Sequence, residues 1–258
     1  MECRERGLIN RSDLDGIDLT WGNEDAIIKM LHKIGKREGI GKLLGEGTVK
    51  IAEGIGSYAI EFAIQVKGLE APAHDPRARN SLALGYATSN RGACHMQAYA
   101  YDWEDGESMI EDLGYPKALG RFETKGKPEF VIKFQNFMSM FDSLHCCKFI
   151  LYGGITLKQL TKTLQLVTGF DIDEEEFLKT GERIFNLKRL YNVRCGISRK
   201  DDTLPPRFLT QRRGSGKFED ELPPLGMMLD EYYKLRSWDE IGIPTAIKIK
   251  ELGLSSLK

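Results

Sequence analysis

Apolar residues recur at helical spacing along most of this chain. The first such segment begins at Asn23, closes at Gly39 and carries one apolar face, made of Ile27, Ile28, Leu31 and Ile34. An asparagine followed by two acidic residues is typical of a helix start, and a glycine is typical of a helix end. The pattern therefore predicts a helix over residues 23–39.

The same period continues through the rest of the sequence. It predicts further helices over residues 43–52, 81–88, 130–142, 156–167, 173–191, 227–235 and 245–252. Thr156 and Asp173 are the expected N-caps of the fourth and fifth of these, and the fifth carries an apolar stripe made of Phe177, Ile184, Leu187 and Leu190. Residues 58–66 fit a short strand or an extended segment equally well. Because no βα unit repeats, the predicted fold class is mainly α.

Two turn-rich segments interrupt the helical pattern. Residues 72–79 contain two prolines and two arginines, and we place a domain boundary there, which gives domains 1–72 and 73–258. Residues 198–224 are rich in Pro, Arg, Gly and Asp, and we expect one long loop that either wraps the surface or lines a site. Its arginines are most simply solvated surface charges: Arg199, Arg207, Arg212 and Arg213.

The charges of the chain are nearly balanced, with 37 Lys plus Arg against 38 Asp plus Glu and a net charge of −1 over 258 residues. This balance gives no electrostatic reason to expect a nucleic acid or an anionic membrane as a partner. No apolar run approaches the roughly 20 residues that a membrane span needs. The first residues are charged and no apolar stretch follows them, so we expect no signal peptide and a cytoplasmic location.

The five cysteines do not form a local metal motif. They are Cys3, Cys94, Cys146, Cys147 and Cys195, and no two of them are separated by two residues. An odd number of cysteines in a reducing compartment argues against a disulfide framework. A complete iron–sulfur site within this chain is therefore not expected from spacing.

Two segments carry residues with chemical potential. Residues 83–95 combine small side chains, a glycine turn and His95, so that another backbone or a flat ligand can approach closely. Residues 142–149 place Asp142 five positions before Cys147, at the end of an apolar helix. The carboxylate can accept hydrogen bonds from a heterocycle, and the thiolate can bind a soft metal. Spacing alone leaves other interpretations open. His95 also fits a structural residue. Asp142 also fits an ordinary helix-end residue, with Cys146 and Cys147 packed in the core.

A series of longer motifs resembles the aldehyde:ferredoxin oxidoreductase family. The matches stay in order from about residue 2 to residue 252 and include Trp21-Gly22-Asn23, Arg37-Glu38-Gly39-Ile40-Gly41, Leu44-Gly45-Glu46-Gly47, Lys67-Gly68-Leu69-Glu70, Asp75-Pro76-Arg77, Gly85 through His95, Tyr191-Asn192-Val193-Arg194, Asp201-Asp202-Thr203-Leu204-Pro205 and Arg207-Phe208. The resemblance implies the helical domains 2 and 3 of that architecture. Residues 1–72 would be the C-terminal portion of the middle helical domain, and residues 73–258 the C-terminal helical domain.

The resemblance also implies a tungsten ion, or occasionally molybdenum, held by two pterin dithiolenes near a [4Fe–4S] cluster. The family has two Asp-x-x-Gly-Leu-Cys/Asp motifs, each of which binds one pterin, and residues 142–147 match the second. Carried over, Asp142 would bind the pterin and Cys147 would be the fourth ligand of the cluster. His145 and Cys146 replace the glycine and leucine, so they are further candidates for contact with the cofactor. His95 matches the histidine proposed as proton donor.

The resemblance implies that a cysteine triad, the first Asp motif and a β-rich N-terminal domain lie outside this sequence. We therefore expect the chain alone to bind no tungstopterin or cluster and to be inactive. The expected partners are ferredoxin and the N-terminal domain or subunit, and a homo-oligomer is also possible. We further expect an exposed apolar surface where that domain would sit, made of Phe137, Met138, Phe141, Leu144 and Phe149. The alternative is a non-catalytic helical interaction module or a subunit of a split enzyme.

Overall fold

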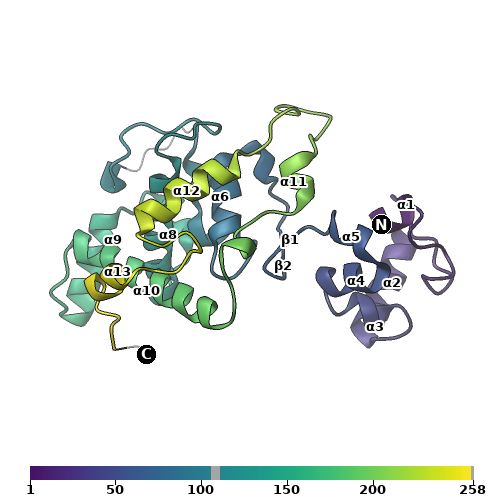
Figure 1. Ribbon diagram of the computed structural model, residues 1–258. Helices are drawn as coiled ribbons and strands as arrows, with labels where there is room; N and C mark the ends of the chain where they lie inside the picture. The colour runs from purple at the N-terminus through teal and green to yellow at the C-terminus, as the bar shows by residue number, and fades with distance from the viewer. Residues whose placement is uncertain (106–110, 257–258) are drawn as a thin grey trace.

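The computed structural model describes residues 1–105 and 111–256, and it is built almost wholly from helices (Figure 1). Its strands within these ranges are β1 (Gln65–Val66) and β2 (Leu69–Glu70), which pair as one short antiparallel hairpin. The predicted mainly α class is confirmed. No helix in the described ranges is long and apolar enough to cross a membrane.

The first helices form a small lobe at one end of the molecule, apart from the larger body (Figure 1). They are α1 (Glu2–Glu5), α2 (Glu24–Lys36), α3 (Gly41–Leu44), α4 (Thr48–Ile55) and α5 (Ser57–Ile60). Two small hydrophobic clusters hold this lobe together, one around Leu14 and Met30 and one around Ala59 and Phe62. The β1–β2 hairpin follows the lobe, and Val66 already belongs to the main core.

The helix predicted at residues 23–39 exists, but its apolar face is only partly used. Asn23 caps α2 by accepting a hydrogen bond from the Ala26 amide, as expected, and the helix ends at Lys36 with Arg37 in the left-handed conformation. The buried positions are Ala26 and Met30. Three members of the predicted stripe are exposed: Ile27, Ile28 and Leu31. The lobe is too small to cover a wide apolar face, so a stripe of large residues faces outward.

Two other predictions in this lobe were wrong in detail. The helix predicted at residues 43–52 is divided into α3 and α4 by Gly45-Glu46-Gly47, where Gly47 has a φ of 91°. Residues 58–66 contain the end of α5 and the start of the hairpin, so they are neither one strand nor one extended segment. The domain boundary between residues 72 and 73 stays a prediction.

The larger body is arranged around one central helix (Figure 1). Its α-helices are α6 (Asn80–Thr88), α7 (His95–Ala98), α8 (Lys127–Ser143), α9 (Leu157–Thr168), α10 (Glu174–Arg194), α11 (Pro206–Thr210), α12 (Leu225–Arg236) and α13 (Ala246–Glu251). Short 3-10 turns join them: η1 (Pro76–Ala78), η2 (Ala100–Trp103), η3 (Glu111–Leu113), η4 (Lys148–Gly153) and η5 (Arg199–Asp201). The central helix is α8, which packs against α6, α7, α10 and α12.

The central position of α8 overturns the predicted exposed apolar surface. Phe137, Met138 and Phe141 are each no more than 1% exposed, because neighbouring helices of the same chain cover them. Leu144 is half-buried against the main core, and only Phe149 of the predicted set is exposed. A helix that is apolar on all sides is buried on all sides, and here the chain itself supplies the cover.

The starts of α9 and α10 confirm the predicted caps. The Thr156 side chain and Gln159 form a capping box, and Asp173 accepts from the Glu176 amide. The buried stripe of α10 differs from the predicted one. The buried residues are Phe177, Gly181, Phe185, Asn186 and Arg189, while Leu187 is exposed.

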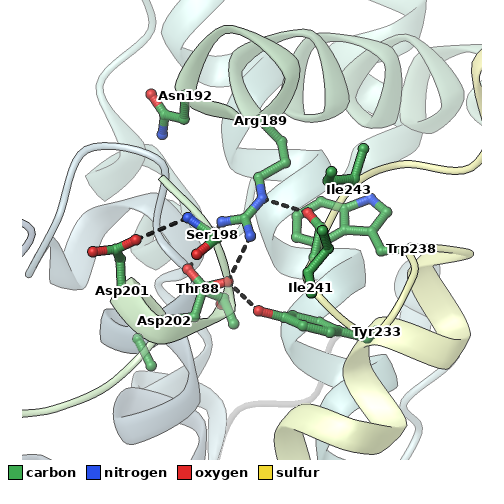
Figure 2. A network of polar contacts seen from close by, with 12 residues as sticks. Thr88, Arg189, Asn192, Ser198, Asp201, Asp202, Tyr233, Trp238, Ile241 and Ile243 are labelled. Atoms are coloured by element: carbon green, nitrogen blue, oxygen red, sulfur yellow. Dashed lines mark hydrogen bonds and ion pairs between the residues drawn. The ribbon is translucent and has the colours of Figure 1, made fainter. Parts of the chain in front are cut away.

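The segment predicted as one loop at residues 198–224 contains η5 and α11. It also carries Asp202, a fully buried carboxylate that is the centre of a polar network (Figure 2). Asp202 pairs with Arg189 of α10 at 2.9 Å and with Lys67 of the hairpin tip at 2.9 Å, and it accepts from the Tyr233 hydroxyl of α12. Arg207 is not a free surface charge either, because it pairs with Glu2 of the first lobe.

We predict that Gly181→Ala will destabilise the fold by about 2 kcal/mol or more. A Cβ at this position would lie 2.0 Å from the carbonyl oxygen of Asn136, so α8 and α10 would have to separate. The measurement is the free energy of unfolding by chemical denaturation. Gly226→Ala in α12 is the matched control, because nothing lies within 4 Å of the added Cβ, and it should raise stability slightly. Equal effects of the two substitutions would contradict the close approach.

Candidate functional site

The segment that leaves α8 forms a left-handed cap. The Cys146 amide donates to the Phe141 carbonyl at 3.0 Å, and the His145 amide lies 3.4 Å from the Asp142 carbonyl. These two bonds define a Schellman motif, in which the residue after the helix adopts positive φ and is most often glycine. That residue is His145, with a φ of 54°. The resemblance implies a glycine at this position, and the left-handed backbone of the cap explains why glycine is favoured there. In this chain His145 adopts that left-handed conformation.

The cap directs the candidate side chains in different directions. The Asp142 side chain is 44% exposed, and Cys147 is an exposed free thiol in extended backbone just past the cap. Cys146 is half-buried against the main core, and its sulfur lies 3.7 Å from the Leu144 carbonyl oxygen. His145 is exposed. Cys147 is therefore accessible to an external metal centre, whereas Cys146 takes the packing place of an apolar side chain.

Lys148 connects this turn to the second candidate segment. Its side chain is 9% exposed, and its ammonium lies 2.8 Å from the Asp142 carboxylate and donates to the Met96 carbonyl at 2.9 Å. Met96 lies in α7, directly after His95. Through its side chain, Lys148 therefore links the segment that follows α8 to α7.

His95 starts α7 after a glycine turn that packs against the hairpin. Gly92 has a φ of 101°, and a Cβ there would lie 2.4 Å from the Val66 carbonyl oxygen, so only glycine fits. The imidazole of His95 is half-buried and lies 4.9 Å from that of His74, measured between ring centroids. Burial lowers the pKa of His95, and the neighbouring His74 lowers it further. Both effects favour the neutral form of the His95 imidazole.

A cavity of about 440 Å³ lies beside the turn. It is lined by Asn90, Arg91, Gln97, Asp142, Leu187, Lys188, Tyr191 and Asn192. The structure thus brings Asp142 together with the glycine-turn segment. Neither Cys147 nor His95 lines this cavity.

The sequence did not predict that residues of α10 line this cavity. Tyr191 and Asn192 belong to a motif that carried the family resemblance, and this was the available signal. Asn192 also donates to the Asn90 carbonyl at 2.7 Å, which ties α10 to the glycine turn.

The turn after α8 presents one exposed thiol and one exposed carboxylate. Within residues 1–105 and 111–256, no group of three or more His, Cys, Asp or Glu side chains is placed to hold a metal ion. The exposed thiol of Cys147 fits one ligand of an iron–sulfur cluster, and the exposed carboxylate of Asp142 fits one acceptor for the N–H groups of a pterin. Further ligands would have to come from beyond the described residues.

The fold and the turn define the class: a mainly helical protein whose central helix ends in an exposed carboxylate and an exposed thiol. The sequence comparisons identify the family. A family model described as aldehyde ferredoxin oxidoreductase, domains 2 and 3, matches residues 1–254, and the chain belongs to this family.

Curated relatives place the match in one portion of larger proteins. The chain is 39% identical to the tungsten-containing aldehyde ferredoxin oxidoreductase of Pyrococcus horikoshii, over 98% of this chain and 41% of that protein. It is 31% identical to a Pyrococcus furiosus protein named aliphatic sulfonate oxidoreductase, WOR-like subunit, over 100% of this chain and 39% of that protein. The chain thus spans about two fifths of the length of the curated relatives it matches.

A solved structure supports the fold alone. The active-site complex BamBC of benzoyl coenzyme A reductase, in complex with 1,5-dienoyl-CoA, matches with a TM-score of 0.74 at 23% identity. The match covers 99% of this chain and 42% of that chain.

We predict that His145→Gly will raise the free energy of unfolding by about 0.5–1 kcal/mol. The substitution relieves the cost of a left-handed side-chain residue, and the entropy of glycine offsets some of the gain. Chemical denaturation measures the change. His32→Gly is the matched control, because His32 is exposed inside α2 and glycine should destabilise there. A loss of stability in His145→Gly would argue against the strained cap.

Proposed function

We propose that this chain is the helical C-terminal portion of a tungstopterin and [4Fe–4S] oxidoreductase that oxidises aldehydes to carboxylates and passes the electrons to ferredoxin. The observation that carries the proposal is the turn after α8, where the accessible Cys147 thiol follows the Asp142 carboxylate in a chain of this family. A curated relative is named tungsten-containing aldehyde ferredoxin oxidoreductase, and this name supports tungsten as the metal and ferredoxin as the electron acceptor.

Oxidation of an aldehyde to a carboxylate takes up one water oxygen and releases two electrons and three protons. The tungstopterin and cluster supply the oxygen and electron chemistry when bound. Cys147 would bind one iron of the cluster, and Asp142 would accept hydrogen bonds from one pterin.

His95 would carry a proton for this reaction. Because its lowered pKa favours the neutral imidazole, His95 can take up a released proton at a ring nitrogen. It can then return that proton in the reverse direction or pass it to solvent. The resemblance implies that His95 is a proton donor. A neutral imidazole can donate a proton in this way only after it has taken one up.

The second candidate is a non-catalytic helical interaction module. The observation that favours it is the replacement of the glycine and leucine of the motif by His145 and Cys146. A chain that joins its partner protein without acquiring tungsten or iron would support this module and overturn the oxidoreductase.

We predict that the chain purified alone under anaerobic conditions will contain neither tungsten nor a full cluster. The described residues provide one exposed thiol at the turn, that of Cys147, and no group of three metal-ligand side chains. Elemental analysis for tungsten and iron tests this. Stoichiometric tungsten with four irons per chain would contradict it.

We predict that Cys147→Ser in the complete oxidoreductase containing this chain will lose cluster iron and ferredoxin reduction. A cysteine thiolate is a good ligand for cluster iron, and a serine hydroxyl is a poor replacement for it. Cys195→Ser is the matched control, because Cys195 is also an exposed free thiol but follows α10 instead of α8. Iron content and ferredoxin reduction at parental level in Cys147→Ser, or equal losses in both variants, would overturn the assignment.

A further inference from the structure

The Lys148 ammonium is buried between two segments of the candidate site. The side chain is 9% exposed, and its partners are the Asp142 carboxylate at 2.8 Å and the Met96 carbonyl at 2.9 Å. A buried ammonium must be compensated by such contacts, because desolvation is costly. Both partners belong to segments that carry candidate site residues: Asp142 ends α8, and Met96 follows His95 in α7.

The Met96 contact supports a helix that has little support of its own. The helix α7 has four residues, from His95 to Ala98, and ends at Tyr99 in the left-handed conformation. Carbonyl groups in the last turn of a helix lack intrahelical donors, and a lysine is one of the side chains that can supply one. Lys148 is therefore a fixed support for the backbone that carries His95.

We propose that Lys148 is a positioning residue whose ammonium fixes Asp142 relative to α7 and sets the charge balance around the His95 ring. Its meaning for catalysis rests on the proposed function.

The surroundings of the His95 ring show how this balance is made. The charged and titratable groups around it include His74, Arg91, Tyr101, Asp102 and Lys148. Burial lowers the pKa of His95 most, His74 adds to this, and Lys148 and Arg91 act in the same direction. Asp102 opposes them. Lys148 is the member of this set that also binds Asp142.

Two substitutions at this ion pair should move the His95 pKa in opposite directions. In Lys148→Met a positive charge disappears and the Asp142 carboxylate is left uncompensated, so the pKa should rise by about half a unit. In Asp142→Asn the ammonium is left uncompensated, so the pKa should fall. Lys148→Arg keeps the charge and should restore a value close to that of the parent chain.

The experiment is an NMR titration of the 258-residue chain with labelled histidine. The sequence has four histidines, His32, His74, His95 and His145, so each imidazole can be assigned from a single His→Asn variant. His32 lies on α2 in the small lobe and serves as the internal control. Lys162→Met, at an exposed lysine of α9, is the matched loss of one charge and should leave His95 unchanged.

Opposite shifts in Lys148→Met and Asp142→Asn, with recovery in Lys148→Arg, would support the inference. A His95 pKa that stays constant in both variants while circular dichroism shows the parent fold would overturn it. If Lys148→Met does not fold, Asp142→Asn alone decides: a lowered pKa supports the inference, and an unchanged or raised pKa overturns it. The titration uses no cofactor, so absence of tungsten and iron from the complete enzyme would overturn the proposed function and leave this result standing.

Discussion

The buried carboxylate of Asp202 holds several elements of the larger body in place. A charge that is fully removed from water must be matched by opposite charges and hydrogen bonds, and here Lys67, Arg189 and Tyr233 provide them. These three partners come from the hairpin, α10 and α12, while Asp202 itself follows η5. Figure 2 shows Asp202 with Arg189 and Tyr233. Burial lowers the pKa of Lys67, and the attraction to Asp202 opposes that shift.

The Asp202 network also positions elements that contact the candidate site. The hairpin that Lys67 anchors is the one against which Gly92 packs, and the turn at Gly92 leads to His95. The helix that Arg189 anchors is α10, which forms one wall of the cavity beside Asp142. The Asp202 network therefore fixes the hairpin and α10, two elements that contact segments of the candidate site.

Local signals in the sequence predicted the elements well wherever a cap or a period was decisive. Thr156, Asp173 and Asn23 cap helices as expected, since a cap needs only neighbouring residues. Which face of a helix is buried depends on distant segments, and this is where prediction failed. Ile27 and Leu31 are exposed, and Phe137 is buried in the core of the chain itself.

In the candidate site, too, local features could be predicted from the sequence and long-range contacts could not. The order of Asp142 and Cys147 around a helix end was readable from spacing, and the structure adds the left-handed conformation at His145. The Lys148 contact with Met96 joins residues 52 positions apart, which no local pattern encodes. The assigned roles of Asp142, His145, Cys146, Cys147 and His95 in cofactor binding and catalysis stay predictions.

The close contact between Gly181 and the Asn136 backbone has a consequence for selectivity. It fixes the spacing of α8 and α10, the two helices that contribute Asp142 and Tyr191 to the cavity walls. A recess between rigidly spaced helices is preorganised, so a ligand that enters it orders little of the protein and loses little binding free energy in doing so. The same rigidity discriminates by shape: a ligand too thick for the recess would have to push the packed helices apart, at the cost of core contacts.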